Sequence, residues 1–213
     1  MTRILFVVAT PQEAADIPAD TGAGTDTDLL VTGIGLLNAT IALTRRLAER
    51  PGAYGHIINV GTAGALVDTH ATVHGFHEVT SAFQHDVSDE LIGAIVGRPW
   101  PNLLDIPAVT DLPGARLATG DSFISSAAER DRIAGRGAQL VDMEGYAVAR
   151  VAAEYGVPVT LIKQVSDSAD EDAAGQWVES ATAGSASLAA TLAGVVTQIS
   201  GRAEGVPPVR WPA

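Results

Sequence analysis

Three acidic residues follow hydrophobic runs of strand length, where their side chains could face a ligand. The acids are Glu13, Glu144 and Asp167. The runs that precede them are Arg3–Ala9, Gln139–Val141 and Val159–Val165. Ligands of open α/β sheets bind at the carboxyl ends of the strands. Because an ionised carboxylate is costly to bury without a partner, each acid either caps a helix or binds a ligand.

The local sequence also offers a capping role for each acid. Thr10 and Glu13 have the spacing of a capping box with a proline between them, so local spacing alone favours capping for Glu13. Glu144 would lie in the first turn of a helix, where negative charge is favourable. Ser166 and Asp167 could cap a turn after a strand. These alternatives stay open at the level of single motifs.

Two glycine motifs follow further strand-like runs. The letters GIG occupy Gly33–Gly35, and GTAG occupies Gly61–Gly64. An isolated Gly-x-Gly is weak evidence for a nucleotide site, and Asn38 stands where a dinucleotide fingerprint needs its third glycine. Tight turns alone would explain both motifs.

Hydrophobic periodicity predicts alternating strands and helices. The remaining predicted strands are Leu29–Thr32, His56–Val60, Glu78–Phe83 and Ala115–Thr119. Helices are expected from Gly33–Gly35 to Arg50, from Gly145 to Tyr155, and over Ala181–Ile199. Continuous apolar strands that alternate with helices indicate an α/β fold. We expect one domain over residues 1–213, with a central mixed, mostly parallel twisted sheet flanked by helices.

Two stretches lack a clear pattern. Residues 87–113 show no hydrophobic period, which predicts an irregular excursion on the surface. Residues 203–213 are rich in proline, which predicts an extended tail.

Composition excludes several classes of function. A net charge of −12 argues against a nucleic-acid partner. There is no cysteine, which excludes disulfides and thiolate metal sites. No apolar run reaches the ~18 residues of a membrane span, and the first run is too short for a secretory signal, so we expect a cytoplasmic protein. His70 and His74 have helical spacing but no zinc-protease glutamate beside them, so neither a metal nor a cofactor is expected.

The order of the motifs resembles the nucleoside phosphorylase and hydrolase superfamily. The matching segments are TGIG, IINVGTAGAL, TGDSFI, VDMEGYAVA and VSDSAD, with Glu13 ahead of them. The resemblance runs from the first strand to the helix after residue 180, is interrupted at 87–113, and is nearest to the 5′-methylthioadenosine/S-adenosylhomocysteine nucleosidases. It implies a homodimer that hydrolyses the N-glycosidic bond of one or both of these purine nucleosides and releases adenine.

The same resemblance implies roles for the acids. Asp167 would be the general acid that protonates the departing base, and Ser166 would orient it. Glu13 would hold the attacking water. Glu144 would accept hydrogen bonds from the ribose 2′ and 3′ hydroxyls.

Further residues would line the substrate pocket by the same resemblance. Met143 would pack on the sugar, Phe123 would stack on the purine, and Ile124 would offer backbone hydrogen bonds to the base. Without the resemblance, Met143 is more often a core residue, and core packing explains Phe123 as well as stacking does. The other implied contacts are Ile34 beside the sugar and the backbone of Thr62, Ala63 and Gly64.

The resemblance leaves rival activities open. A phosphorylase needs arginines around its phosphate, and none stands at the first strand end or just before the GTAG turn, which favours water over phosphate. Lys163 stands where the family has arginine, and Asp142 and Thr10 replace a glutamate and a methionine. Adenosine, inosine or futalosine are alternative substrates, although a futalosine hydrolase should carry asparagine at position 167. A nucleoside-binding module without turnover is the alternative from another class.

Overall fold

The computed structural model describes residues 3–15, 17, 26–67, 75–182, 186–202 and 205–211. His70 and His74 lie outside these residues. The strands are β1 Arg3–Val8, β2 Thr27–Val31, β3 Tyr54–Ala65, β4 Phe76–Gln84, β5 Leu103–Asp105, β6 Gly114–Thr119, β7 Leu140–Asp142 and β8 Val159–Asp167. The helices are α1 Pro11–Ala15, α2 Leu36–Glu49, α3 Asp89–Val96, α4 Ala127–Ala134, α5 Gly145–Tyr155, α6 Ala173–Thr182 and α7 Ala186–Ser200.

The eight strands form one mixed sheet whose order is β2-β1-β3-β7-β6-β4-β5, with β8 paired to both β3 and β4. The β1–β2, β1–β3, β3–β8, β4–β6 and β6–β7 pairs are parallel, and the other three are antiparallel. The predicted mixed, mostly parallel sheet is thereby confirmed. The pairings also join β3, β7, β6, β4 and β8 into a closed circuit, which the sequence did not predict.

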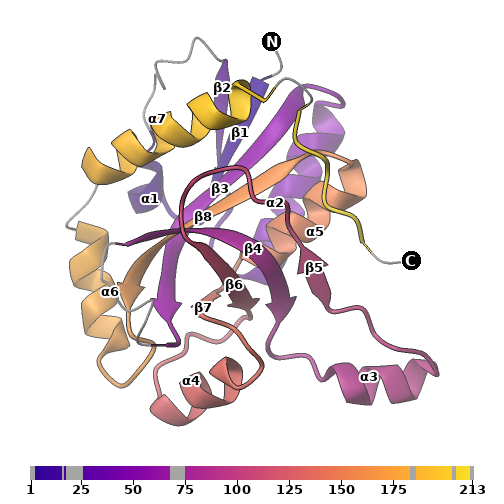
Figure 1. The fold of residues 1–213 in the computed structure, drawn as a ribbon, viewed down its shortest axis with the longest axis vertical. Helices are drawn as coiled ribbons and strands as arrows, with labels where there is room; N and C mark the ends of the chain where they lie inside the picture. Colours follow the sequence, from indigo (N-terminus) through magenta and orange to yellow (C-terminus); the bar gives the residue numbers. More distant parts are fainter. Residues whose placement is uncertain are drawn as a thin grey trace.

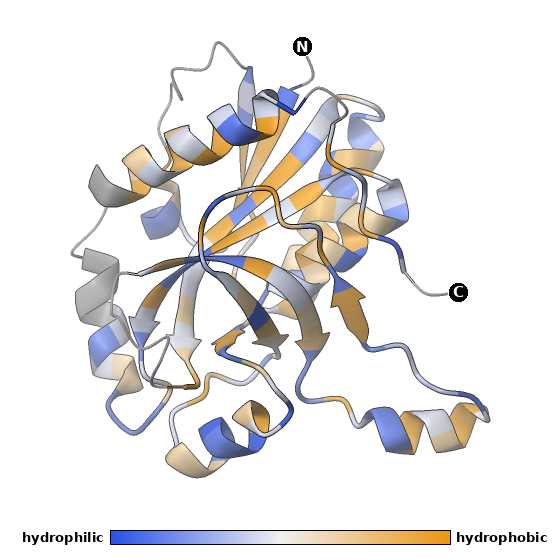
Figure 2. Cartoon of the chain, viewed as in Figure 1, coloured by the Kyte–Doolittle hydropathy of each residue, from blue (hydrophilic) through white to orange (hydrophobic). Residues whose placement is uncertain are grey.

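Helices cover both faces of this sheet (Figure 1). Strand β1 shows why, because its side chains alternate between two hydrophobic clusters. Leu5 and Val7 pack in the cluster that holds buried residues of α2 and α5. Phe6 packs with Leu192 and Val196 of α7 on the opposite face. Both faces of β1 are therefore buried, as its continuous apolar run predicts, and Figure 2 shows the apolar colour along the central strands.

The expected irregular excursion at 87–113 was wrong in part, because the segment contains α3 and β5. Ser88 caps α3 by accepting a hydrogen bond from Leu91 N–H, and Gly97 ends it in the left-handed conformation. No side chain of α3 is buried. Its apolar residues recur at helical spacing, but the helix has only eight residues and contains Gly93, so the pattern is short. Strand β5 has three residues and pairs antiparallel to β4.

Two other boundaries differ from expectation. The predicted closing helix Ala181–Ile199 corresponds to the end of α6 and to α7, and residues 183–185 lie outside the described part. Residues 205–211 of the proline-rich tail have no helix or strand. They are nevertheless packed, since Val206 and Val209 are buried and the Trp211 ring meets the Tyr146 ring edge-on at 6.4 Å.

Candidate active site

A cavity of about 300 Å³ opens where β1, β3, β7 and β8 end. All eleven site residues predicted from the sequence line it: Glu13, Ile34, Thr62, Ala63, Gly64, Phe123, Ile124, Met143, Glu144, Ser166 and Asp167. Six further residues complete the lining: Ala9, Thr10, Ser122, Val141, Asp142 and Trp177. The volume lies at the lower end of the range of small-molecule sites.

Glu13 both caps a helix and faces the cavity. Glu13 N–H donates to Thr10 Oγ1 at 3.2 Å, and Glu13 Oε2 accepts from Ala9 N–H and Thr10 N–H at 3.0 Å each. Its other oxygen, Oε1, accepts from Thr62 N–H at 3.1 Å. The capping box is therefore real, and the same carboxylate joins the ends of β1 and β3 at the wall of the cavity. Three backbone donors suit an ionised carboxylate.

Asp167 lies at the end of β8 and is buried. Its Oδ2 lies 2.7 Å from Ser166 Oγ, and its Oδ1 accepts from Ala169 N–H at 2.9 Å. Burial raises the pKa of Asp167 above its ordinary value and outweighs these two hydrogen bonds, which lower it. A Cβ at Gly64 would lie 2.8 Å from Asp167 Oδ1, so glycine is required where β3 passes this acid.

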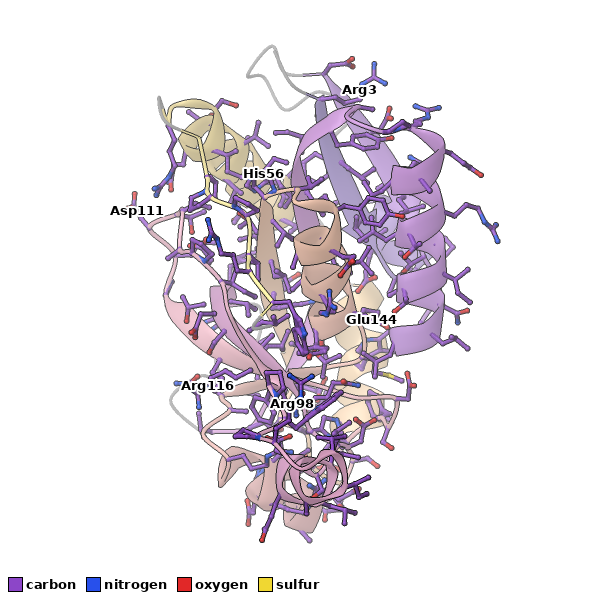
Figure 3. All side chains as sticks on the ribbon, turned by 90° about the vertical axis from the view of Figure 1, so that its right-hand side faces the viewer. Arg3, His56, Arg98, Asp111, Arg116 and Glu144 are labelled. Atoms are coloured by element: carbon purple, nitrogen blue, oxygen red, sulfur yellow. The ribbon has the colours of Figure 1, made fainter. Side chains whose placement is uncertain are left out.

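Glu144 occupies the N-cap position of α5 but does not cap it. The first amides of α5 are bound elsewhere, because Gly145 N–H donates to Asp142 Oδ2 at 2.8 Å and Tyr146 N–H donates to Thr119 Oγ1 at 3.0 Å. The Glu144 carboxyl group instead lines the cavity, where Oε1 accepts from Gly35 N–H at 2.7 Å. Figure 3 shows Glu144 near one end of α2 and of α5.

The pKa of Glu144 is raised to about 7. Burial is the main cause, and the nearby Asp142 and Glu13 carboxylates raise it further. Lys163 and the Gly35 N–H act in the opposite direction. Glu144 is thus an acid whose protonation changes near neutral pH.

Asp142 and Lys163 form a buried ion pair beside the cavity. Lys163 Nζ lies 2.8 Å from Asp142 Oδ2, and both side chains are 1% exposed. Asp142 Oδ1 also accepts from Thr119 Oγ1 at 2.6 Å. Burial would lower the pKa of Lys163, but the carboxylates of Asp142, Glu144 and Glu13 raise it above its ordinary value. Lys163 therefore stays charged behind a group of acids and forms a salt bridge with Asp142.

The apolar side of the cavity is partly open. Phe123 is 45% exposed and Ile34 is 50% exposed, whereas Ile124 is buried. Trp177 of α6 also lines the cavity, and its Nε1–H donates to Thr62 Oγ1 at 3.1 Å. Phe123 is not a core residue, so simple core packing does not explain it.

Sequence reasoning did not assign Asp142 or Trp177 to the site. Asp142 carried a signal, because Lys163 stands inside the apolar run Val159–Val165 and a lysine buried there needs an acidic partner. Trp177 carried none, because α6 was not predicted and a tryptophan in a polar stretch indicates no direction. Both positions follow from the packing of distant segments.

Two features are absent from the residues that the structure describes. None of the helices in that part of the chain is long and apolar enough to cross a membrane. The same residues contain no cluster of three or more His, Cys, Asp or Glu side chains arranged to hold a metal ion.

The chain is similar to known proteins over most of its length. The family model of the phosphorylase superfamily matches residues 23–200. A 5′-methylthioadenosine/S-adenosylhomocysteine nucleosidase of Arabidopsis thaliana is 33% identical over 189 residues, which cover 84% of this chain and 72% of the plant protein.

Solved structures share the fold. A nucleosidase of the same name from Helicobacter pylori superposes with a TM-score of 0.80 at 21% identity, covering 92% of this chain and 98% of the other. The futalosine hydrolase of the same organism, solved as a mutant, reaches 0.78 at 19% identity, covering 93% and 100%. The family model, which matches most of the chain, and the plant relative show that the chain belongs to the phosphorylase superfamily.

Proposed function

We propose that the chain hydrolyses the N-glycosidic bond of a purine nucleoside, namely 5′-methylthioadenosine, S-adenosylhomocysteine or both, and releases adenine. The observation that carries this proposal is the convergence of Glu13, Glu144 and Asp167 on one cavity. The plant relative, a 5′-methylthioadenosine/S-adenosylhomocysteine nucleosidase, supports the choice of substrates.

Asp167 is the proposed general acid. Cleavage leaves negative charge on the departing purine, and protonation at N7 removes it. Burial raises the pKa of Asp167, which favours its protonated form, and the adjacent Ser166 hydroxyl fixes the orientation of the carboxyl group. A buried acid that remains protonated is suited to this step.

Glu13 is the proposed partner of the attacking water. Its two oxygens are already fixed by backbone amides just after β1 and in β3, so the carboxylate needs no rearrangement to polarise a water molecule. The water oxygen forms a bond to C1′ as the bond from C1′ to N9 breaks, and the water gives up a proton to the Glu13 carboxylate. Negative charge on Glu13 also stabilises the positive charge that develops on the sugar.

Glu144 is the proposed ribose contact. A carboxylate can accept from two vicinal hydroxyls, and α5 does not use Glu144 as its cap. Met143 and Ile34 would contact the sugar, while Phe123, Ile124 and the segment Thr62–Gly64 would hold the base. All of these residues line the cavity.

Water is favoured over phosphate by the charge of the cavity. Among the described lining residues, four are acidic (Glu13, Asp142, Glu144 and Asp167) and none is basic. Lys163 lies behind them and is paired with Asp142. A phosphate dianion would therefore meet net negative charge.

A substrate panel tests the proposal. The protein is incubated with methylthioadenosine, adenosylhomocysteine, adenosine, inosine and futalosine, each with and without phosphate, and free base is measured. We expect adenine from the first two substrates at a rate independent of phosphate. Release that requires phosphate, or binding without release, would refute hydrolysis in favour of a phosphorylase or a binding module.

We further propose a homodimer in the cytoplasm. Exposed apolar side chains continue from the cavity mouth onto the outer face of α2, where Leu37 is 69% and Ile41 is 47% exposed. A second copy seated there would cover the half-exposed Ile34 and Phe123. Light scattering should show twice the monomer mass, and Leu37→Glu should halve it; a monomeric wild type would refute the dimer.

A further inference from the structure

Two consecutive backbone amides at the start of α2 bind two carboxylates. Gly35 N–H donates to Glu144 Oε1 at 2.7 Å, and Leu36 N–H donates to Asp121 Oδ1 at 2.7 Å. Asp121 is 85 positions away from Leu36 along the chain. The loop before α2 is thus held between an acid of the cavity and an acid outside it.

A local side chain does not cap this helix. Gly35 is the N-cap residue, with φ of 97° and ψ of 159°, a conformation that favours glycine. A glycine has no side chain to accept the first amides, which a helix leaves unpaired. Asp121 accepts the Leu36 N–H in its place. A Cβ at position 35 would lie 2.8 Å from Asp121 Oδ1, so Gly35 and Asp121 fit closely together.

Asp121 is itself fixed by the neighbouring strand end. It lies in the segment after β6, and its N–H donates to Asp86 Oδ2, beyond the end of β4, at 3.3 Å. Its carboxylate is exposed, so burial does not explain an acid at this position. The carboxylate instead accepts the Leu36 N–H, which is the amide next to the Gly35 N–H that binds Glu144.

We propose that Asp121 is a positioning residue for Glu144, acting through the Gly33–Gly35 loop. This inference rests on the proposed ribose contact of Glu144. Asp121 fixes Leu36 N–H, which directs the preceding Gly35 N–H at Glu144 Oε1. With that oxygen held, the rest of the carboxyl group faces the cavity in one orientation.

A purely structural role for Asp121 makes a different prediction. If the acid only stabilised α2, its loss would weaken every ligand equally and in proportion to lost stability. If it positions Glu144, its loss weakens ligands that carry a ribose and spares free adenine. Asp28 provides a matched control. Its carboxylate accepts from Tyr54 Oη at 2.7 Å and from Arg50 Nη1 at 3.1 Å. These contacts lie near the start of β2 and the end of α2, away from the Gly33–Gly35 loop.

The test compares Asp121→Ala, Asp121→Asn and Asp28→Ala with the wild type. Loss of a hydrogen bond to a charged group predicts that Asp121→Ala raises KM for methylthioadenosine roughly tenfold, with a smaller change in kcat. The inhibition constant of adenine should stay at the wild-type value. Asparagine can still accept the Leu36 N–H, so Asp121→Asn should restore KM to within about threefold. Equal losses for nucleoside and adenine, or a wild-type KM in Asp121→Ala, would overturn the proposal.

A second readout does not depend on turnover. The Gly35 N–H lowers the pKa of Glu144, so the Glu144 carboxyl carbon, followed by NMR in the ligand-free protein, should titrate at higher pH in Asp121→Ala than in the wild type or Asp28→Ala. An unchanged titration overturns the link even if nucleosides are hydrolysed. If no nucleoside is hydrolysed, the proposed function fails while a shifted titration still supports the link.

Discussion

Lys163 and Asp142 form an ion pair of 2.8 Å in which both side chains are almost completely buried. The pair joins β8 to the end of β7, and Asp142 also binds the Gly145 N–H at the start of α5. One buried contact therefore connects the strand that ends in Asp167 with the turn that carries Glu144. This contact therefore contributes both to the stability of the fold and to the electrostatic potential in the cavity.

Removal of Lys163 should destabilise the fold strongly. Lys163→Met leaves Asp142 as a buried charge without its cation, which costs about 3–5 kcal/mol in comparable pairs. Glu154→Ala removes one partner of the exposed Arg150–Glu154 pair and should cost less than about 1 kcal/mol. Urea denaturation of both variants measures the difference. Equal losses would show that the buried pair contributes no more than the surface pair.

Asp167→Asn should abolish turnover and retain ligand binding. Asparagine keeps the size of the side chain but cannot deliver a proton to the base, and loss of general acid catalysis lowers kcat by about 10²–10⁴. Single-turnover kinetics and calorimetric binding of methylthioadenosine check the two expectations. Turnover at the wild-type rate would remove Asp167 from the mechanism.

Glu144 should set the acid limb of the pH profile. Its pKa is about 7, and the ionised form accepts the ribose hydroxyls, so kcat/KM should fall as the pH decreases below neutrality. Lys163 lowers this pKa, and Lys163→Met should therefore move the limb to higher pH. The profile is measured at pH values where both proteins remain folded. If the acid limb does not move in Lys163→Met, the limb reports the titration of a group other than Glu144.

His56 should make stability depend on acid pH. Burial lowers the pKa of His56 to about 4, and the ring lies 2.9 Å from Thr160 Oγ1. Between pH 6.5 and 4 the unfolded chain binds a proton that the folded chain does not, so stability is present above this window and is lost as the pH falls through it. The loss can reach about 3 kcal/mol. Unfolding of His56→Gln from pH 8 to 5 should lack this component; parallel curves for the two proteins would contradict it.

Trp211 should anchor the tail to α5. Its ring meets Tyr146 edge-on, and the Arg150 guanidinium lies 4.5 Å from its centre. Trp211→Ala removes both contacts and should cost about 1–2 kcal/mol, while Arg210→Ala, an exposed neighbour, should cost almost nothing. Thermal unfolding measures the loss of stability in each variant. A tail that contributes nothing would leave both variants with the wild-type Tm.

The predictable part of this fold rests on local signals. The apolar run of β1 identified a strand buried on both faces, and Gly156, which ends α5 in the left-handed conformation, marked a helix end. The closed circuit of β3, β7, β6, β4 and β8 could not be predicted, because β7 has three residues and the double pairing of β8 depends on distant strands. Helix α3 was missed because it has only eight residues and contains Gly93, which weakens a helix prediction.

The predicted site depended on motif order more than on local chemistry. Spacing alone favoured a capping role for Glu13. In the structure Glu13 forms the capping box and also lines the cavity. For Glu144 the local interpretation was incomplete, since Asp142 and Thr119 bind the first amides of α5. Thr119 lies too far along the chain for any local pattern to reveal that contact.

The most direct test of hydrolysis is to follow the oxygen that reaches the sugar. Methylthioadenosine is incubated with the protein in isotopically labelled water and unlabelled phosphate, and the released sugar is examined by mass spectrometry. We expect one heavy oxygen on the methylthioribose and no sugar phosphate, because the cavity brings Glu13, Glu144 and Asp167 together with no basic side chain among its described lining residues. A phosphorylated sugar without the label would contradict the account.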